Sequence, residues 1–214
     1  LRGRNGAWEF GVTGSGGDAG GLEIERKWLL RGLPERLDRE PEATWECWRL
    51  RQGYLPAPSK EDLDRLARVE ADGRDGPEIP GVGRLRSIEP LGPQRGPVRH
   101  VHTLKLGSGL VRREIEREIS AEVFARAWGG TEGRRLEKIR WRGPEGGVIW
   151  EIDRFDAPAV ARGMVLVEAE TTDEAAAGSL RLPSWIEPLA VREVTHEPAF
   201  TNAEIAFRAG SSRA

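Results

Sequence analysis

The sequence predicts an α+β fold dominated by antiparallel β-sheet, with a few short helices packed outside it. The first observation is a repeated alternation of charged and apolar residues, as in residues 22–30 (Leu-Glu-Ile-Glu-Arg-Lys-Trp-Leu-Leu). Such a period of two sends successive side chains to opposite faces of a strand. The second is that helical patterns are few and short. The third is that segments rich in glycine and proline, such as residues 73–83 and 90–97, separate the alternating runs as loops do. Many strands with few helices favour an antiparallel sheet.

The composition describes a soluble globular protein and excludes several classes. Charged residues make up 32% of the 214 residues, yet the formal net charge is only −2. This balance excludes a simple basic nucleic-acid binder and an acidic disordered tail. The uncharged apolar stretches are too short to cross a membrane as a helix. The single cysteine, Cys47, excludes an internal disulfide framework and is expected to be an inert packing residue. We therefore expect a cytoplasmic protein without nucleic-acid or membrane partners.

The length and the distribution of glycine predict one domain with two short tails. Residues 1–21 are rich in glycine, arginine and polar residues, and we expect them to form a flexible N-terminal tail. Residues 22–208 carry all the predicted strands and helices and form the single domain. Residues 209–214 form a C-terminal tail. The sequence contains no information from which we can predict an oligomeric state.

Charged residues are expected to share one face of each predicted strand. In residues 22–30, Glu23, Glu25 and Lys27 lie on one face, and Ile24 and Trp28 lie on the other. Further alternating segments each carry a charged face: Arg84 and Arg86; Lys105; Arg112, Glu114, Glu116 and Glu118; Lys138 and Arg140; Glu151 and Asp153; Glu168 and Glu170. The same parity places Trp150 opposite the charges, so we expect Trp28 and Trp150 to pack against covering helices.

Helix-start residues predict four short helices. Ser59 with Asp62 begins one that runs to about residue 71, and Ser120 caps a second that ends after Trp128. A third follows Thr172, and Asn202 is expected to cap the last, to about residue 208. The three histidines, His100, His102 and His196, are scattered, and we expect them at the surface or behind the site rather than in catalysis.

The charged faces have two interpretations that the residues alone leave open. A half-buried antiparallel strand shows charged residues to water, and cross-strand pairs then contribute only a few tenths of a kcal/mol. However, Glu114, Glu116 and Glu118 stack like charges along one strand, which costs energy unless a cation lies between them. If the sheet closes with these faces inward, the interior must hold water and ions, because a dry charged core is prohibitive. The second interpretation is therefore a wet tunnel that binds a charged ligand.

Such a tunnel suits a polyphosphate and a divalent metal. A Glu-x-Glu strand sets two carboxylates roughly 6.5 Å apart on one face, and carboxylates suit Mg²⁺ or Mn²⁺. Lysine and arginine bind phosphate oxygens. Phosphoryl transfer needs mainly charge neutralisation and an oriented nucleophile, which a metal-bound water beside a carboxylate supplies. No GxxxxGK[ST], HExxH or GxSxG motif is present, which excludes the common phosphate-loop, zinc-protease and hydrolase interpretations.

The motifs resemble a known family. Glu23-Ile24-Glu25-Arg26-Lys27 resembles the ExExK signature of the CYTH domain, found in the triphosphate tunnel metalloenzyme superfamily. The resemblance covers residues 22–207 and continues, in order, through Gln52-Gly53-Tyr54-Leu55, Arg84-Leu85-Arg86, Thr103-Leu104-Lys105, Arg112-x-Glu114-x-Glu116, Lys138-Ile139-Arg140, Trp150-Glu151-Ile152-Asp153-x-Phe155, Glu168-Ala169-Glu170, Pro183-x-Trp185, Glu193-Val194-Thr195 and Asn202. The resemblance implies a closed eight-stranded antiparallel β-barrel that forms a tunnel with a charged interior. It also implies hydrolysis of inorganic tripolyphosphate to pyrophosphate and phosphate with Mg²⁺ or Mn²⁺.

The resemblance also implies roles for individual residues. Glu23, Glu25, Glu168 and Glu170 would hold the metals. The phosphate track would be lined by Lys27, Arg84, Arg86, Lys105, Arg112, Lys138 and Arg140. The catalytic set would be Glu23, Glu25, Lys27, Glu116, Glu168 and Glu170. Glu114 would orient water, metal or basic neighbours, as would Glu116. Glu151 and Asp153 would either act similarly or be structural salt-bridge partners.

One departure leaves the choice of substrate open. After Glu193-Val194-Thr195 the family runs to an acidic residue and then Arg-Tyr, whereas here Glu197 is followed by Pro-Ala-Phe. Within the family, a class IV-type adenylyl cyclase and a thiamine triphosphatase are alternatives to an inorganic triphosphatase. A non-catalytic polyphosphate-binding module is the alternative of another class. A solvated β-domain with exposed charges remains the purely structural interpretation.

Overall fold

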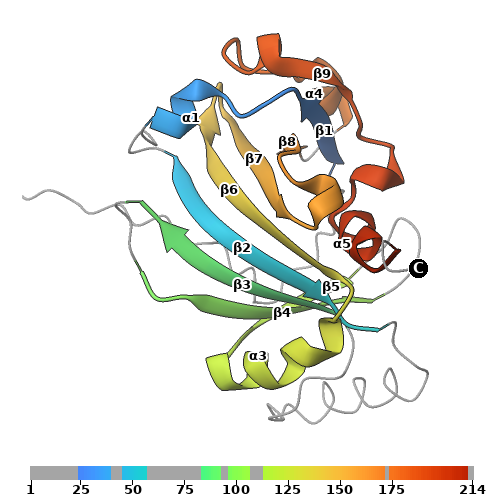
Figure 1. The fold of residues 1–214 in the computed structure, drawn as a ribbon. Coiled ribbons are helices and arrows are strands. Elements are labelled where there is room, and N and C mark those ends of the chain that lie inside the picture. Colours follow the sequence, from blue (N-terminus) through green and yellow to red (C-terminus); the bar gives the residue numbers. More distant parts are fainter. Residues whose placement is uncertain are drawn as a thin grey trace, which may run out of the picture.

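A single antiparallel sheet forms the body of the molecule. The structure is a computed structural model, and it describes residues 24–39, 45–56, 83–92, 96–106, 113–171 and 174–211. Within these ranges nine strands are hydrogen-bonded in the order β5-β4-β3-β2-β6-β7-β8-β1-β9 (Figure 1). The strands are β1 (Ile24–Leu30), β2 (Glu46–Tyr54), β3 (Arg84–Leu91), β4 (Arg99–Leu106), β5 (Arg113–Ile119), β6 (Arg135–Glu145), β7 (Val148–Ala157), β8 (Val165–Thr171) and β9 (Ala190–Glu193).

The predicted antiparallel sheet with few helices is confirmed, but the closed eight-stranded barrel is not. The sheet curves strongly, yet in the described residues its edge strands β5 and β9 do not pair with each other (Figure 1). The described sheet also contains a ninth strand, β9, which the sequence did not predict. Only four residues long, β9 pairs along β1 and forms one edge of the sheet.

Short helices flank the sheet: α1 (Glu35–Arg39), α3 (Ala121–Trp128), α4 (Glu174–Ser179) and α5 (Asn202–Ser211). The prediction for α3 is confirmed, since the backbone N–H of Val123 donates to the Ser120 hydroxyl over 3.2 Å. Helix α1 was not predicted, and the helix expected from Ser59 lies outside the described residues. None of the helices in the described ranges has the length and apolar character needed to cross a membrane.

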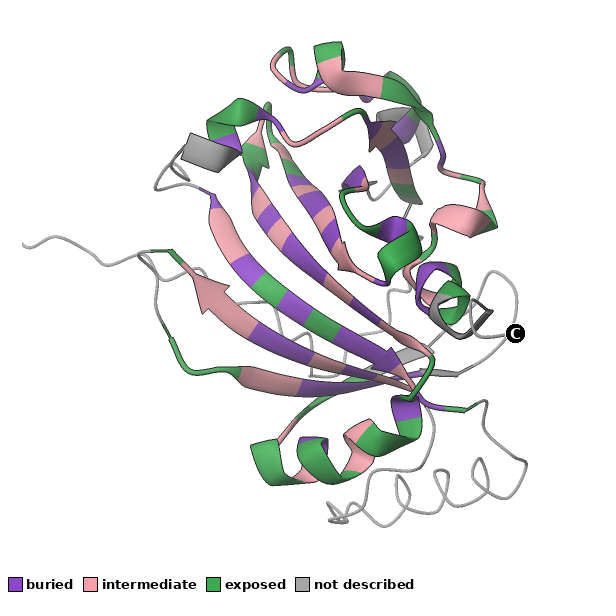
Figure 2. Cartoon of the chain, in the orientation of Figure 1, coloured by how far each residue is buried: buried purple, intermediate pink, exposed green. Residues whose placement is uncertain are grey.

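Two faces of the sheet can be distinguished on β2. Trp48, Leu50 and Gln52 are buried on what we call the inner face, whereas Arg49 and Arg51 are exposed on the outer face. Figure 2 shows this as a banded strand. The outer charges form exposed ion pairs with neighbouring strands, such as Arg49 with Glu89 at 2.9 Å. Such pairs contribute little to stability.

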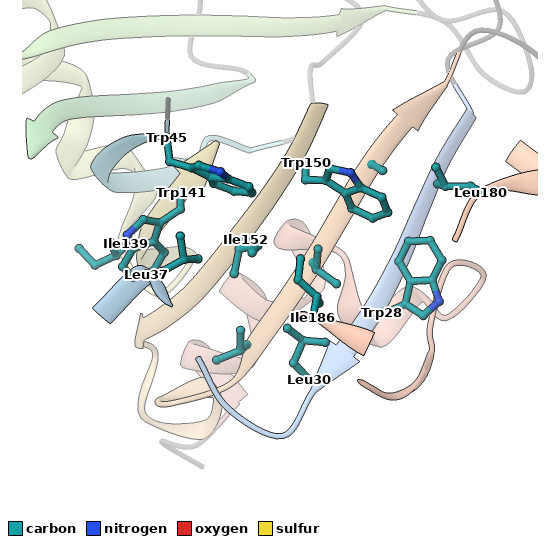
Figure 3. Close-up of a cluster of buried hydrophobic side chains, with 13 residues drawn as sticks. Trp28, Leu30, Leu37, Trp45, Ile139, Trp141, Trp150, Ile152, Leu180 and Ile186 are labelled. Atoms are coloured by element: carbon teal, nitrogen blue, oxygen red, sulfur yellow. The ribbon is translucent and has the colours of Figure 1, made fainter. Parts of the chain in front are cut away.

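The main apolar core lies on the outer face of β1, β6, β7 and β8. Trp28 and Trp150 are buried there with their ring centroids 6.0 Å apart, and Leu37 of α1 and Ile186 pack against the same cluster (Figure 3). The predicted parity is therefore confirmed, because both tryptophans point away from the charged face. Aromatic packing on this side fixes the strands whose other side carries the site.

Candidate active site

The strand register brings the predicted site residues onto the inner face. Directly opposed residues of an antiparallel pair lie on the same face, and so do alternate residues of one strand. The relevant cross-strand pairs are Lys27 with Glu168, Glu25 with Glu170, Glu168 with Glu151, Asp153 with Arg140, Arg86 with Gln52, Arg84 and Glu116 with Thr103, and Lys105 with Glu114. Because Gln52 and Arg140 belong to the same face through β2 and β6, these pairs form one continuous surface.

Five predicted residues are described only in part or not at all. Glu23 and Arg112 lie outside the described residues. For Lys105, Glu114 and Glu170 the structure gives the strand position alone, and that position agrees with the inner face. The assignments of these five residues stay predictions.

Asp153 is the centre of a buried charge cluster. Arg140 donates to it through Nε and Nη2, each over 2.7 Å, and the Lys138 ammonium donates to Oδ2 over 2.6 Å. Burial alone would raise the pKa of Asp153, but the two cations outweigh it and the pKa lies below its usual range. Burial and the charge of Arg140 lower the pKa of Lys138 to about 8. Asp153 therefore stays ionised and fixes both cations.

Lys27 joins the carboxylates of β1 and β8. Its Nζ lies 2.8 Å from Glu25 Oε1 and 3.0 Å from Glu168 Oε1. Burial acts to lower the pKa of Lys27, but the charges of Glu168 and Glu25 outweigh it, so the pKa is raised. Arg140 continues the row, pairing with Glu151 and lying 3.4 Å from Glu168 Oε2. Acidic and basic side chains thus alternate across four neighbouring strands, β1, β8, β7 and β6.

Arg86 differs from these cations. In the described part of the chain no carboxylate lies within ion-pair distance of it, and its Nε donates to Gln52 Oε1 over 3.2 Å. Gln52 is fully buried and in turn donates to the Tyr54 hydroxyl over 2.5 Å. Burial, together with the charges of Arg84 and Arg140, lowers the pKa of Arg86. A neighbouring anion would stabilise this guanidinium.

Arg84, Thr103 and Glu116 form a polar group at the other side of the face. Arg84 Nη2 donates to the Thr103 hydroxyl over 3.1 Å, and that hydroxyl donates to Glu116 Oε2 over 3.3 Å. Arg84 and Glu116 themselves are 3.8 Å apart, and the Glu116 side chain is 53% exposed. Glu116 therefore presents an ionisable carboxylate that is accessible to water.

Apolar side chains also lie on the inner face. Trp48, Leu50, Ile88 and Val101 form a small buried cluster on β2, β3 and β4. The inner face is thus partly apolar, and the charged rows lie beside this cluster.

The segment that leads into α5 contributes polar groups whose part in the site the sequence did not indicate. The Phe200 carbonyl oxygen accepts from Lys27 Nζ over 3.4 Å, and Asn202 Oδ1 accepts from Lys138 Nζ over 2.9 Å. Asn202 was expected to cap α5; instead the Thr201 hydroxyl accepts from the Glu204 backbone N–H over 3.3 Å. The Phe207 ring packs against Tyr54. Gln52, Tyr54 and Asn202 lie within the matched motifs, which is the only sequence signal for them.

The carboxylates that are described fit a divalent metal in their chemistry. The part of the chain that the structure describes holds no group of three or more His, Cys, Asp or Glu side chains arranged around one point. However, Glu25 and Glu168 converge on the same ammonium, and the register places Glu170 directly opposite Glu25. Such hard carboxylate oxygens are the ligands that Mg²⁺ and Mn²⁺ prefer.

Comparison with known proteins identifies the relatives of this chain. No protein-family model matches the sequence. An inorganic triphosphatase of Nitrosomonas europaea is 34% identical over 188 residues, which span 86% of this chain and 97% of the relative. Two crystal structures of NE1496, one described as an inorganic triphosphatase and one as a hypothetical protein, superpose with TM-scores of 0.50 and 0.53. They are 26% and 28% identical to this chain, cover 86% of it, and are themselves covered over 94% and 97% of their lengths. The chain therefore belongs to the CYTH-domain inorganic triphosphatases of the triphosphate tunnel metalloenzyme superfamily.

Proposed function

We propose that this protein hydrolyses inorganic tripolyphosphate to pyrophosphate and phosphate with the help of a divalent metal. The observation that carries the proposal is the row of alternating charges Glu25, Lys27, Glu168 and Arg140 on one face of the sheet. Arg86 lies on the same face and has no carboxylate within ion-pair distance among the described residues. Similarity to the Nitrosomonas enzyme over most of both chains supports it.

The cations supply the phosphate track. Arg140 presents a guanidinium whose orientation is fixed by Asp153, and Arg86 is held by Gln52 without a competing carboxylate among the described residues. Planar guanidinium groups bind phosphate oxygens in pairs, and Lys27 adds a compact charge. Arg84, Lys105 and Arg112 would extend the track. Each of these cations would have a phosphate oxygen as its partner.

The carboxylates of β1 and β8 would hold the metal. Glu25 and Glu168, with Glu23 and Glu170, provide the oxygen ligands. When bound, Mg²⁺ or Mn²⁺ would neutralise phosphate charge and lower the pKa of a bound water. Lys27 lies between Glu25 and Glu168, and its ammonium would also face a phosphate oxygen.

Glu116 is suited to receive a proton or to orient the attacking water. Phosphoryl transfer asks the protein for positioning and charge neutralisation rather than covalent chemistry. Among the described site carboxylates, Asp153, Glu168 and Glu151 each have a cation closer than the 3.8 Å between Arg84 and Glu116. With its half-exposed side chain, Glu116 has the solvent contact that a proton acceptor needs.

The alternative substrates need an additional pocket for a ring. An adenylyl cyclase or a thiamine triphosphatase must recognise a base or a thiazole, which aromatic side chains often do. Trp28 and Trp150 are not available for this purpose, because both are buried in the core on the outer face. This observation excludes Trp28 and Trp150 as a stacking platform for such a ring.

The test is a panel of tripolyphosphate, pyrophosphate, ATP and thiamine triphosphate, each assayed for phosphate release with Mg²⁺ and with Mn²⁺. We expect tripolyphosphate to have the highest kcat/KM, and cyclic AMP to be absent from the ATP products. Glu168→Gln is expected to lose turnover while its affinity for tripolyphosphate falls less. A chain that binds tripolyphosphate and never turns it over would be a binding module instead.

A further inference from the structure

We infer that Asn202, the first residue of α5, is a positioning residue that fixes the phosphate-binding Arg140 through Lys138 and Asp153. The inference rests on the proposed function, because it assigns a role within the same site. It also assigns Lys138 to the support of the site rather than to direct contact with phosphate.

The Lys138 ammonium is enclosed by protein. Its side chain is 0% exposed, and Nζ donates to Asp153 Oδ2 over 2.6 Å and to Asn202 Oδ1 over 2.9 Å. The Phe155 ring covers it at 5.5 Å. A buried ammonium needs acceptors for its protons, since an unpaired one is strongly destabilising. Two of the three protons are used by these partners, so the ammonium is held from both sides.

Asp153 passes this constraint on to Arg140. Oδ2 of Asp153 accepts from both Lys138 Nζ and Arg140 Nη2, and Oδ1 accepts from Arg140 Nε. The place of the ammonium therefore decides how the carboxylate is turned, and the guanidinium plane follows the carboxylate because the pair is bidentate. Without the Asn202 oxygen, Asp153 would be the one remaining acceptor among these contacts for the Lys138 ammonium. The ammonium would then shift toward Oδ2 of Asp153, which also accepts from Arg140.

Asn202 and its neighbour Thr201 perform separate tasks. Thr201 caps the helix, since its hydroxyl accepts from the Glu204 backbone N–H, whereas the Asn202 oxygen points to Lys138. Helix α5 is also held by Ile205 and Ala206, which are buried against Leu136 and Phe155. Replacing Asn202 should therefore leave the helix in place. This arrangement offers a matched pair of variants, one that removes the cap and one that removes the link to the site.

The experiment measures tripolyphosphate hydrolysis by the full-length protein and by three variants. Asn202→Leu is expected to lower kcat/KM about tenfold, mainly through KM, which is the size of one hydrogen bond to a buried charged group. Asn202→Asp keeps an acceptor oxygen and should stay within about threefold of the wild type. Thr201→Ala should lower the melting temperature and leave kcat/KM within about twofold, because a lost cap affects stability alone.

Three results would overturn the inference: an unchanged kcat/KM in Asn202→Leu, an equal loss of kcat/KM in Thr201→Ala, or no rescue by Asn202→Asp. If Asn202→Leu does not fold, Lys138→Met answers the same question. In that background Asn202→Ala, which adds no charge, should have no further effect on kcat/KM, and a further loss would refute the relay through Lys138.

A second measurement separates this inference from the proposed function. Calorimetric titration of tripolyphosphate in EDTA measures binding without turnover, and we expect Asn202→Leu to weaken it about tenfold. A wild type that binds tripolyphosphate but hydrolyses none would refute the proposed function. The comparison of affinities would still decide the inference about Asn202. Equal affinities of the wild type and Asn202→Leu would refute the inference alone.

Discussion

Arg140 and Asp153 face each other across β6 and β7 and share two parallel hydrogen bonds, Nε to Oδ1 and Nη2 to Oδ2, each 2.7 Å long. The carboxylate is fully buried, whereas the guanidinium retains contact with solvent and lies beside Glu151 and Glu168. Arg140 thus connects the buried support of the sheet to the row of carboxylates and cations that we propose to bind the metal and the phosphates.

Replacing Asp153 should strongly destabilise the fold. Asp153→Asn leaves Lys138 and Arg140 as buried cations without their shared carboxylate, which costs about 3–5 kcal/mol in the free energy of unfolding. Urea denaturation followed by tryptophan fluorescence measures the loss. Glu89→Gln is the matched control, because its ion pair with Arg49 is exposed and contributes less than about 1 kcal/mol. Equal effects of the two substitutions would contradict a central structural role for Asp153.

The stabilisation by Asp153 should depend on pH in a defined direction. Although burial opposes it, the charges of Arg140 and Lys138 lower the pKa of Asp153 below the 3.8 of an ordinary aspartate. A lowered carboxyl pKa gives stability that is complete above the unfolded-state pKa and is lost as the pH falls through the folded-state value. The difference in unfolding free energy between wild type and Asp153→Asn should thus be constant between about pH 5 and pH 7 and shrink below about pH 4. A difference that grows on acidification would contradict this assignment.

Arg86 is expected to matter for binding and little for stability. Arg86→Met should lower kcat/KM for tripolyphosphate about 100-fold, because a guanidinium–phosphate contact is lost. The free energy of unfolding should change by less than about 1 kcal/mol, since removing a cation without a carboxylate partner in the described residues offsets the lost bond to Gln52. Arg51→Met, on the exposed outer face, serves as the control and should leave kcat/KM unchanged. Unaltered hydrolysis by Arg86→Met would exclude Arg86 from the phosphate track.

Gly53, between Gln52 and Tyr54, is required by close packing. A Cβ atom at this position would lie 2.6 Å from both Cβ and Oγ1 of Thr131, and Thr131 is held by its hydrogen bonds to Trp128 and Arg135. We expect Gly53→Ala to lower the free energy of unfolding by about 1–3 kcal/mol, the usual cost of overpacking. Gly32→Ala is the comparison, because nothing lies within 4 Å of its added Cβ. Thermal melts of both variants measure the difference, and equal melting temperatures would show that Thr131 moves aside.

Glu168 should contribute to metal binding. Titration of Mn²⁺ followed by electron paramagnetic resonance should show affinity weakened about tenfold or more in Glu168→Gln, which loses a charged oxygen ligand. Glu193→Gln is the control. Glu193 forms its ion pair with Arg26, and Arg26 lies opposite Ala169 on the outer face, away from the site. The same Mn²⁺ affinity in wild type and Glu168→Gln would remove this residue from the metal site.

The alternation of residues predicted the charged face but not the partners within it. Glu25, Lys27, Asp153 and Glu168 lie where the period of two places them, since strand parity is a local property. The edge strand β9 was not predicted, because its four residues show no alternation long enough to recognise. The pairing of each cation with its carboxylate depends on the register between strands that are distant in the sequence. That register cannot be read from the sequence of one strand.

The uncharged members of the site were harder to identify. Gln52, Thr103 and Asn202 are residue types that are common at surfaces and caps, so their composition signals no site. Their roles arise from neighbours far away in the sequence: Arg86 for Gln52, Glu116 for Thr103 and Lys138 for Asn202. Asn202 illustrates this limit, because a helix start predicts a cap and only the tertiary structure shows that its oxygen faces a lysine.

The most direct test of the central claim is phosphorus NMR of the wild-type protein with tripolyphosphate and Mg²⁺ or Mn²⁺. We expect the tripolyphosphate signals to disappear while pyrophosphate and phosphate appear in equal amounts, and we expect EDTA to stop the conversion. Intact tripolyphosphate with folded protein and either metal would contradict the claim that this protein is a metal-dependent triphosphatase.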